Sequence, residues 1–168
     1  PNKKNEDWKF TDLNSILSKN FDNITNKDFL LDSKKLNLIN EFDHNHIYLI
    51  DGKLISSDFT YEDRNKISII DFNYKNNINI DNNNSLNLLN NALANVGFTL
   101  EISKNYKLNK PLIIYNYFSE NLKETIINNK NSIILNDNSE LTLINYIDNN
   151  SKDNFMVNSM ENIEIKRD

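Results

Sequence analysis

Two segments near the end of the printed sequence repeat one pattern at an offset of 22 residues, from Ile134 to Met156. Each of them, Ile134–Leu143 and Met156–Ile165, reads as a short strand, a polar corner and a strand with alternating apolar residues. Leu112–Tyr115 precedes them in the same phase. A repeat of this length, with short strands and polar corners, indicates the stacked coils of a β-solenoid. An ordinary antiparallel meander remains the alternative.

Apolar and polar residues alternate from Phe98 onward, which predicts strands. The expected strands are Phe98–Ile102, Leu112–Tyr117, Ser132–Leu135, Glu140–Tyr146, Phe155–Val157 and Asn162–Lys166. In a solenoid we expect Leu141, Leu143, Ile163 and Ile165 to face inward, because side chains alternate along a strand. The offset of the repeat then stacks Leu143 on Ile165 of the next coil.

The first half of the chain mixes helix and strand signals. Ile47–Ile50 and Lys53–Ser56 flank Asp51-Gly52, a pair that a two-residue type I′ turn prefers because both residues need positive φ. Ser68–Phe72 predicts a further strand, and 76–84 reads as a polar loop. Helices are expected at 12–20, after Thr11, and at 85–96, with Ser85 as the cap and Gly97 as the C-terminal glycine. The apolar face of the second helix is predicted to hold Leu86, Leu89, Leu93 and Val96, with Ala92 beside them.

These patterns predict a mainly β fold with small helical elements, in which a helix and hairpin region (1–97) precedes the solenoid (98–168). The chain of 168 residues has only two glycines. Asn tolerates the left-handed conformation better than most residues, so we expect it to fill turn positions.

Composition limits the partners of the chain. A net charge of −5 argues against binding to a nucleic-acid backbone. The absence of cysteine excludes disulfides and cysteine ligation of a cluster by these residues. No apolar run approaches the ~20 residues of a membrane span. We therefore expect a cytoplasmic protein without nucleic-acid or membrane partners.

One octet carries the most specific signal for function. Glu6, Trp8, Lys9, Phe10 and Thr11 resemble the acidic-x-Trp-Lys-aromatic-Thr motif of the SufB/SufD family of iron–sulfur cluster assembly proteins, of which SufD is the more similar branch. Further features fit the family in the right order along the whole chain. They are the lead-in Pro1–Lys4, the hairpin at Tyr48–Ile55, the helix end with Leu89, Asn90, Ala92, Leu93 and Gly97, the strand opened by Pro111, and the strand pair in Ser132–Tyr146. The chain departs from the family at Asn145, where an acidic residue is common, and at Asn129-Lys130-Asn131, which replaces a His-Pro-Arg-like entry to the strand.

The resemblance implies an N-terminal α/β cap that leads into the first coils of a right-handed parallel β-helix. It implies a non-catalytic scaffold subunit of a SufB–SufC–SufD complex in iron–sulfur cluster assembly. The implied partners are a SufB-like subunit, through the β-helices, and a SufC-like ATPase, through a C-terminal helical region. We expect the printed sequence to be a piece of a longer protein. It is therefore assigned no catalytic, cofactor-binding or metal-ligating residue, and the cluster is handled by the complex.

Two groups of residues could carry chemistry or binding of their own. Asp43-His44-Asn45-His46 would place both imidazoles on one face of a strand, as in a metal site, although no third ligand is evident and a polar loop is the alternative. Trp8 and Phe10 could anchor a partner or pack a helix onto the body. Glu6 and Asp7 are adjacent, so they are poorly placed to converge on one substrate.

Two other functions remain open: a β-helical carbohydrate-active enzyme and a generic cytosolic binding module. The enzyme would need carboxylates at matched positions on neighbouring coils. The offset of the repeat pairs Glu140 with Asn162 and Thr142 with Glu164, so it predicts no acidic ladder.

Overall fold

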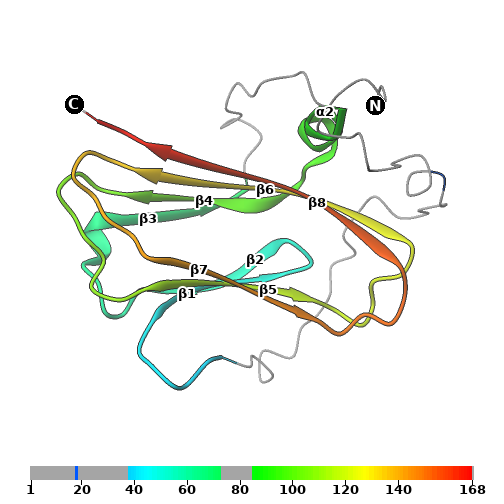
Figure 1. The fold of residues 1–168 in the computed structure, drawn as a ribbon, viewed down its shortest axis with the longest axis horizontal. Helices are drawn as coiled ribbons and strands as arrows, with labels where there is room; N and C mark the ends of the chain where they lie inside the picture. Colours follow the sequence, from blue (N-terminus) through cyan, green and yellow to red (C-terminus); the bar gives the residue numbers. More distant parts are fainter. Residues whose placement is uncertain (1–17, 19–37, 73–84, 168) are drawn as a thin grey trace, which may run out of the picture.

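In the residues that the structure describes, the chain forms two facing β-sheets, a short α-helix and a short 3-10 helix, as the sequence predicts at the level of a mainly β fold (Figure 1). The structure is a computed structural model that describes residues 18, 38–72 and 85–167. Sheet I contains, in spatial order, β2 (Lys53–Asp58), β1 (Asn45–Ile50), β5 (Leu112–Phe118) and β7 (Leu143–Asn149). Sheet II contains β3 (Ile67–Asp71), β4 (Val96–Ile102), β6 (Thr125–Leu135) and β8 (Phe155–Ile165).

The predicted hairpin is confirmed. β1 and β2 pair antiparallel, and Asp51 and Gly52 both have positive φ, at 48° and 81°. The turn is buried, and the Asp51 carboxylate accepts hydrogen bonds from the backbone N (2.8 Å) and the hydroxyl (2.7 Å) of Ser119. Burial raises the pKa of Asp51, and the two bonds from Ser119 partly oppose that shift. The turn is therefore fixed to the chain that leaves β5.

From β4 onward the chain passes from one sheet to the other and back, and the pairing within each sheet is parallel. Parallel partners lie 30 to 33 residues apart: Val96 pairs with Asn129, Leu112 with Leu143, and Thr125 with Phe155. The predicted offset of 22 is therefore wrong. Leu143 pairs with Leu112 in sheet I, and Ile165 pairs with Leu135 in sheet II, so these two residues do not stack on each other.

The register error has a physical cause in the polar residues of β6 and β8. Sequence patterning predicted a corner at Asn158-Ser159, whereas β8 runs without a break through both residues. β6 likewise begins at Thr125 rather than Ser132 and includes five polar residues in a row, 128–132. β7 covers Leu143–Asn149 instead of Glu140–Tyr146, because Glu140 belongs to the corner.

The apolar core lies between the two sheets. Its buried members are Ile47, Leu49, Phe59, Phe98, Leu100, Ile102, Leu112, Ile114 and Ile133. Leu141 and Leu143 pack against this cluster, as predicted for inward-facing residues. Ile163 and Ile165 are in register with core residues of β6 but are largely exposed, because β8 is the outermost strand of sheet II.

Successive corners of the chain lie on one another. Asn105 and Asn138 both have positive φ, and the amide nitrogen of Asn138 donates to the amide oxygen of Asn105 over 3.1 Å. Beside them Lys104 pairs with Asp137 at 2.9 Å. The prediction that Asn occupies left-handed turn positions is confirmed at both corners.

Helix α2 (Ser85–Leu93) lies against the outer face of sheet II and ends earlier than predicted (Figure 1). Val96 and Gly97 begin β4 instead of completing the helix. Gly97 is therefore not a helix C-terminal glycine. Its φ of 133° is unfavourable for other residues, and a Cβ there would overlap the carbonyl oxygen of Lys130 on β6. The glycine allows two strands to approach closely.

The corner between β2 and β3 is organised by Glu62, which lies just before the short helix η3 (Arg64–Lys66). Its carboxylate accepts hydrogen bonds from Asn45 Nδ2 (2.8 Å), Tyr106 OH (2.8 Å), Asn109 N (2.9 Å) and Lys110 N (3.1 Å). Burial raises the pKa of Glu62, but the hydrogen bonds together lower it below its usual value. One side chain thus joins the starts of β1 and β5.

Several predictions lie outside the described residues. They are the motif at Glu6–Thr11, the lead-in Pro1–Lys4, the helix at 12–20 and the loop at 76–84. The division at residue 97 stays a prediction.

Candidate functional site: the open edge of β7 and β8

β7 and β8 are the outermost strands of their sheets, and they lie at the same end of the molecule (Figure 1). β7 pairs with β5 and β8 with β6, so within the described residues the other side of each strand has no strand partner. Unpaired strand edges present rows of backbone N–H and C=O groups that recruit further strands. We call β7, β8 and the space between them the open edge.

Apolar side chains gather at the open edge. Those with large exposed fractions are Ile144, Tyr146, Ile147, Val157, Ile163 and Ile165. One row of inward-facing residues shows why they are exposed. From β4 to β6 to β8, Leu100, Ile133 and Ile163 pair in register, and their exposed fractions are 0%, 5% and 52%. Ile163 therefore occupies a core position that no further strand covers among the described residues.

The centre of the open edge is polar. A cavity of about 100 Å³ lies there, lined by Gly52, Asn116, Phe118, Asn129, Asn145, Ile147, Val157, Ser159 and Glu161. Asn116 Nδ2 donates to Asn145 Oδ1 over 2.5 Å. Asn129 Oδ1 and both amide atoms of nearby Asn131 are buried without a hydrogen-bond partner among the described residues. Because buried polar atoms are rarely left unpaired, this region favours contact with water or with polar groups of a covering chain.

Amide side chains gather at the centre of the open edge. Asn145 and Asn129 line its cavity, and Asn131 lies next to it on the same strand face as Asn129. Glu161 adds one carboxylate to the lining.

The outer face of sheet II is already covered by α2. Asn90, which is fully buried, donates through Nδ2 to the carbonyl oxygens of Asn129 (2.9 Å) and Asn158 (2.6 Å). Asn158 Nδ2 donates in turn to Leu86 O (3.1 Å) and to Asn128 Oδ1 (3.1 Å). Asn90 is the polar residue between Leu89 and Asn91, and its side-chain amide joins α2 to two strands of sheet II. Ala92 of the same helix is exposed.

The two histidines lie on one side of β1, as their spacing predicts, and both rings contact Tyr115. His44 Nδ1 is 3.0 Å from Phe42 O, and His44 Nε2 is 2.9 Å from the Tyr115 hydroxyl. Both ring nitrogens are therefore already engaged. Burial lowers the pKa of His46, while Asp58 partly opposes the shift.

No group of three His, Cys, Asp or Glu side chains with metal-binding geometry occurs in the part of the chain that the structure describes. The two imidazoles pack against Tyr115, which stacks on Tyr48 and lies tilted against Tyr146. Trp8, Phe10, Glu6 and Asp7 lie outside the described residues.

Sequence reasoning did not single out Ile147 or the asparagines at the centre of the open edge. The signal for Ile147 was present, since Leu143, Asn145 and Ile147 alternate with Ile144 and Tyr146. It was obscured because both alternating sets contain apolar residues.

No protein-family model matches the sequence, and no curated protein matches it significantly. No helix within residues 38–72 and 85–167 combines the length and apolar character needed to cross a membrane.

Proposed function

We propose that this chain is a non-catalytic scaffold subunit of a SufB–SufC–SufD-type complex for iron–sulfur cluster assembly in the cytoplasm. In this proposal the two sheets are the first coils of a right-handed parallel β-helix, and residues 1–97 include its cap. A SufB-like subunit and a SufC-like ATPase are its partners. The resemblance of Glu6–Thr11 to the family motif indicates which complex the chain would join, and the open edge is the surface through which it would bind its partner.

The β-helix part rests on the way the strands and corners repeat. Parallel partners recur every 30 to 33 residues in both sheets. The corners repeat at the same interval, as in Asn105 with Asn138 and Lys107 with Glu140. Right-handed crossovers are the rule for parallel strands, which favours the right-handed form.

The open edge is the single observation that carries the scaffold part. A row of half-exposed core residues beside two unpaired strands is favourable only when another chain segment covers it. A covering segment, whether a further coil of the same protein or part of a partner, would add strands to both sheets at once. A scaffold subunit that joins its partner through β-helix strands would present a surface of this kind.

The carbohydrate-active alternative depended on matched carboxylates. In the observed registers of the described strands, Glu161 pairs with Asn131 and Glu164 pairs with Ile134, so no two carboxylate residues face each other directly there. At the corner, Glu140 pairs with Lys107 at 2.6 Å. We therefore favour the scaffold.

Co-purification tests the proposal. The 168-residue chain, in which the open edge is exposed, would be co-expressed with the SufB-like and SufC-like subunits of the same organism, with the affinity tag on the SufB-like subunit. We expect the wild-type chain to co-purify and Ile147→Ser/Ile163→Ser to be lost. Ile55→Ser is the matched control, because Ile55 is a similarly exposed isoleucine on β2 at the other end of sheet I. Failure of the wild-type chain to join either subunit would overturn the proposal.

A further inference from the structure

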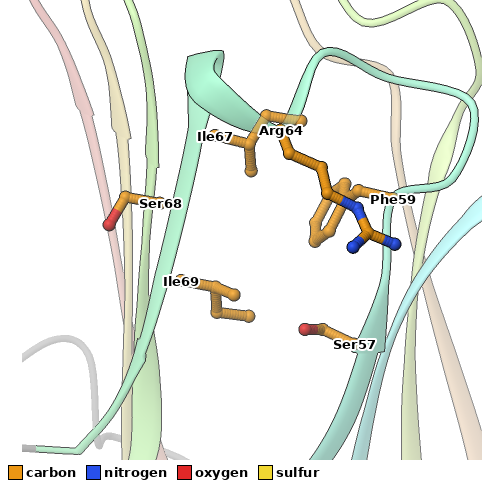
Figure 2. A pocket seen from close by; sticks show the side chains of 6 residues that line it. All are labelled: Ser57, Phe59, Arg64, Ile67, Ser68 and Ile69. Atoms are coloured by element: carbon orange, nitrogen blue, oxygen red, sulfur yellow. The ribbon is translucent and has the colours of Figure 1, made fainter.

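A larger cavity lies at the opposite end of the molecule, between edge strands β2 and β3 (Figure 2). It has a volume of about 460 Å³ and is lined by Ser57, Phe59, Arg64, Ile67, Ser68 and Ile69. Cavities that bind small molecules usually have volumes of roughly 300–1,000 Å³, with mostly apolar walls and a few polar groups. This cavity has that size, and its lining combines three apolar residues with three polar ones.

Three of the six residues that line the cavity are apolar. Figure 2 shows Ile67 and Ile69 pointing from β3 across the gap toward Phe59 and Ser57, while Ser68 points the other way. Phe59 belongs to the buried core, and Ile67 and Ile69 pack against that core. A ligand in the gap would therefore rest on the end of the apolar core.

One cation stands at the mouth of the cavity. Arg64 begins η3, and its guanidinium extends over the Phe59 ring toward Ser57 (Figure 2). Among the described residues, no carboxylate lies within ion-pair distance of this guanidinium. A guanidinium presents a planar fork of donors that matches a carboxylate in two parallel hydrogen bonds.

We propose that this cavity binds a small organic anion with a carboxylate head and a short aliphatic body. The carboxylate pairs with Arg64 and accepts a further hydrogen bond from the Ser57 hydroxyl, which faces the gap (Figure 2). The aliphatic body covers Phe59, Ile67 and Ile69. A fully polar anion would leave those walls in water, and an aliphatic ammonium would meet the charge of Arg64. The site is independent of the scaffold proposal, since it lies at the other end of the sheets.

Octanoate is the probe for the test. The full chain, with isoleucine methyl groups labelled with carbon-13, would be titrated with sodium octanoate and followed by calorimetry and by NMR. We expect saturable binding at one site, with shifts at the methyl groups of Ile67 and Ile69. Arg64→Gln should weaken binding at least tenfold. Lys66→Gln, which removes a charge from the same short helix but does not line the cavity, should change it less than twofold.

Three results would overturn the proposal. They are no binding at millimolar octanoate, equal affinity for Arg64→Gln and wild type, or equal affinity for octylammonium and octanoate. Because Arg64 is exposed, Arg64→Gln should fold normally, and its unperturbed methyl spectrum would verify this.

Discussion

The edge strands at the two ends of the sheets differ in length and in the way they pair with their neighbours. At one end, β2 and β3 are short strands of six and five residues that pair antiparallel with their neighbours. A register shift between Tyr48 and Leu49 interrupts the β1–β2 pairing, and Lys53 lies at the start of β2. At the other end, β7 and β8 pair parallel with β5 and β6, and β8 runs for 11 residues. Short, irregular and charged strands discourage further pairing, whereas long regular ones invite it.

The interior changes along the same direction. The residues paired from β4 to β6 to β8 run Val96, Asn129, Ser159 in one row. The row beside it begins with Phe98 and ends with Glu161. Apolar burial is therefore greatest around β1 and β4. The end formed by β2 and β3 therefore terminates both sheets, whereas the end formed by β7 and β8 can accept further strands.

Gly97→Val should have the largest effect, because the new side chain would push apart β4 and β6, the two central strands of sheet II. The new side chain would overlap Lys130 O and require an unfavourable φ, so the cost should be about 4 kcal/mol or more, the range of severe single substitutions. Urea unfolding measures the change, with Asn95→Ala, at an exposed position nearby, as the control. A loss below about 1 kcal/mol would contradict the close approach of β4 and β6.

Glu62→Gln tests the end of the molecule that β2 and β3 form. The substitution removes a charged acceptor of hydrogen bonds from Asn45, Tyr106, Asn109 and Lys110, and we expect a loss of about 2 kcal/mol in stability. Glu120→Gln, at an exposed glutamate, should have little effect. Equal stability of both variants would mean that the corner does not secure this end.

The same carboxylate predicts a pH dependence. The pKa of Glu62 is lowered in the folded state, so its stabilising contribution is present above the ordinary pKa of 4.5 and is lost as pH falls through the folded value. The stability difference between wild type and Glu62→Gln should therefore shrink as pH falls below 4.5. Unfolding curves from neutral to acid pH measure it, and a difference that grows in acid would contradict the sign.

A double-mutant cycle gives the smallest effect but tests the register. Leu112→Ala and Leu143→Ala should couple by about 0.5 kcal/mol or more, because these residues are partners in sheet I. Leu143→Ala and Ile165→Ala should be additive within about 0.5 kcal/mol, because Ile165 lies in sheet II. The reverse outcome would restore the offset of 22 residues and move the open edge.

The sequence predicted the elements whose signals are local. The turn at Asp51-Gly52 was recognisable because type I′ geometry selects those two residues, and β4 and β5 were recognisable from their apolar residues. The register was not predictable, because Asn128 and Asn158 look like corner residues. Inside the fold, their amides bond to each other, and Asn158 also bonds to α2. Gly97 was misassigned for a similar reason, since its function is a contact with a strand more than thirty residues away.

Hydrogen exchange resolved by peptide, with and without the SufB-like partner that we propose, tests the central claim most directly. The account predicts that the partner slows exchange of backbone amides in β7 and β8, which lack partners on one side among the described strands. Amides in β2 and β3 should exchange at the same rate in both samples. Protection confined to β2 and β3, or no protection in either pair of strands, would contradict the claim that the open edge is the end that a partner covers.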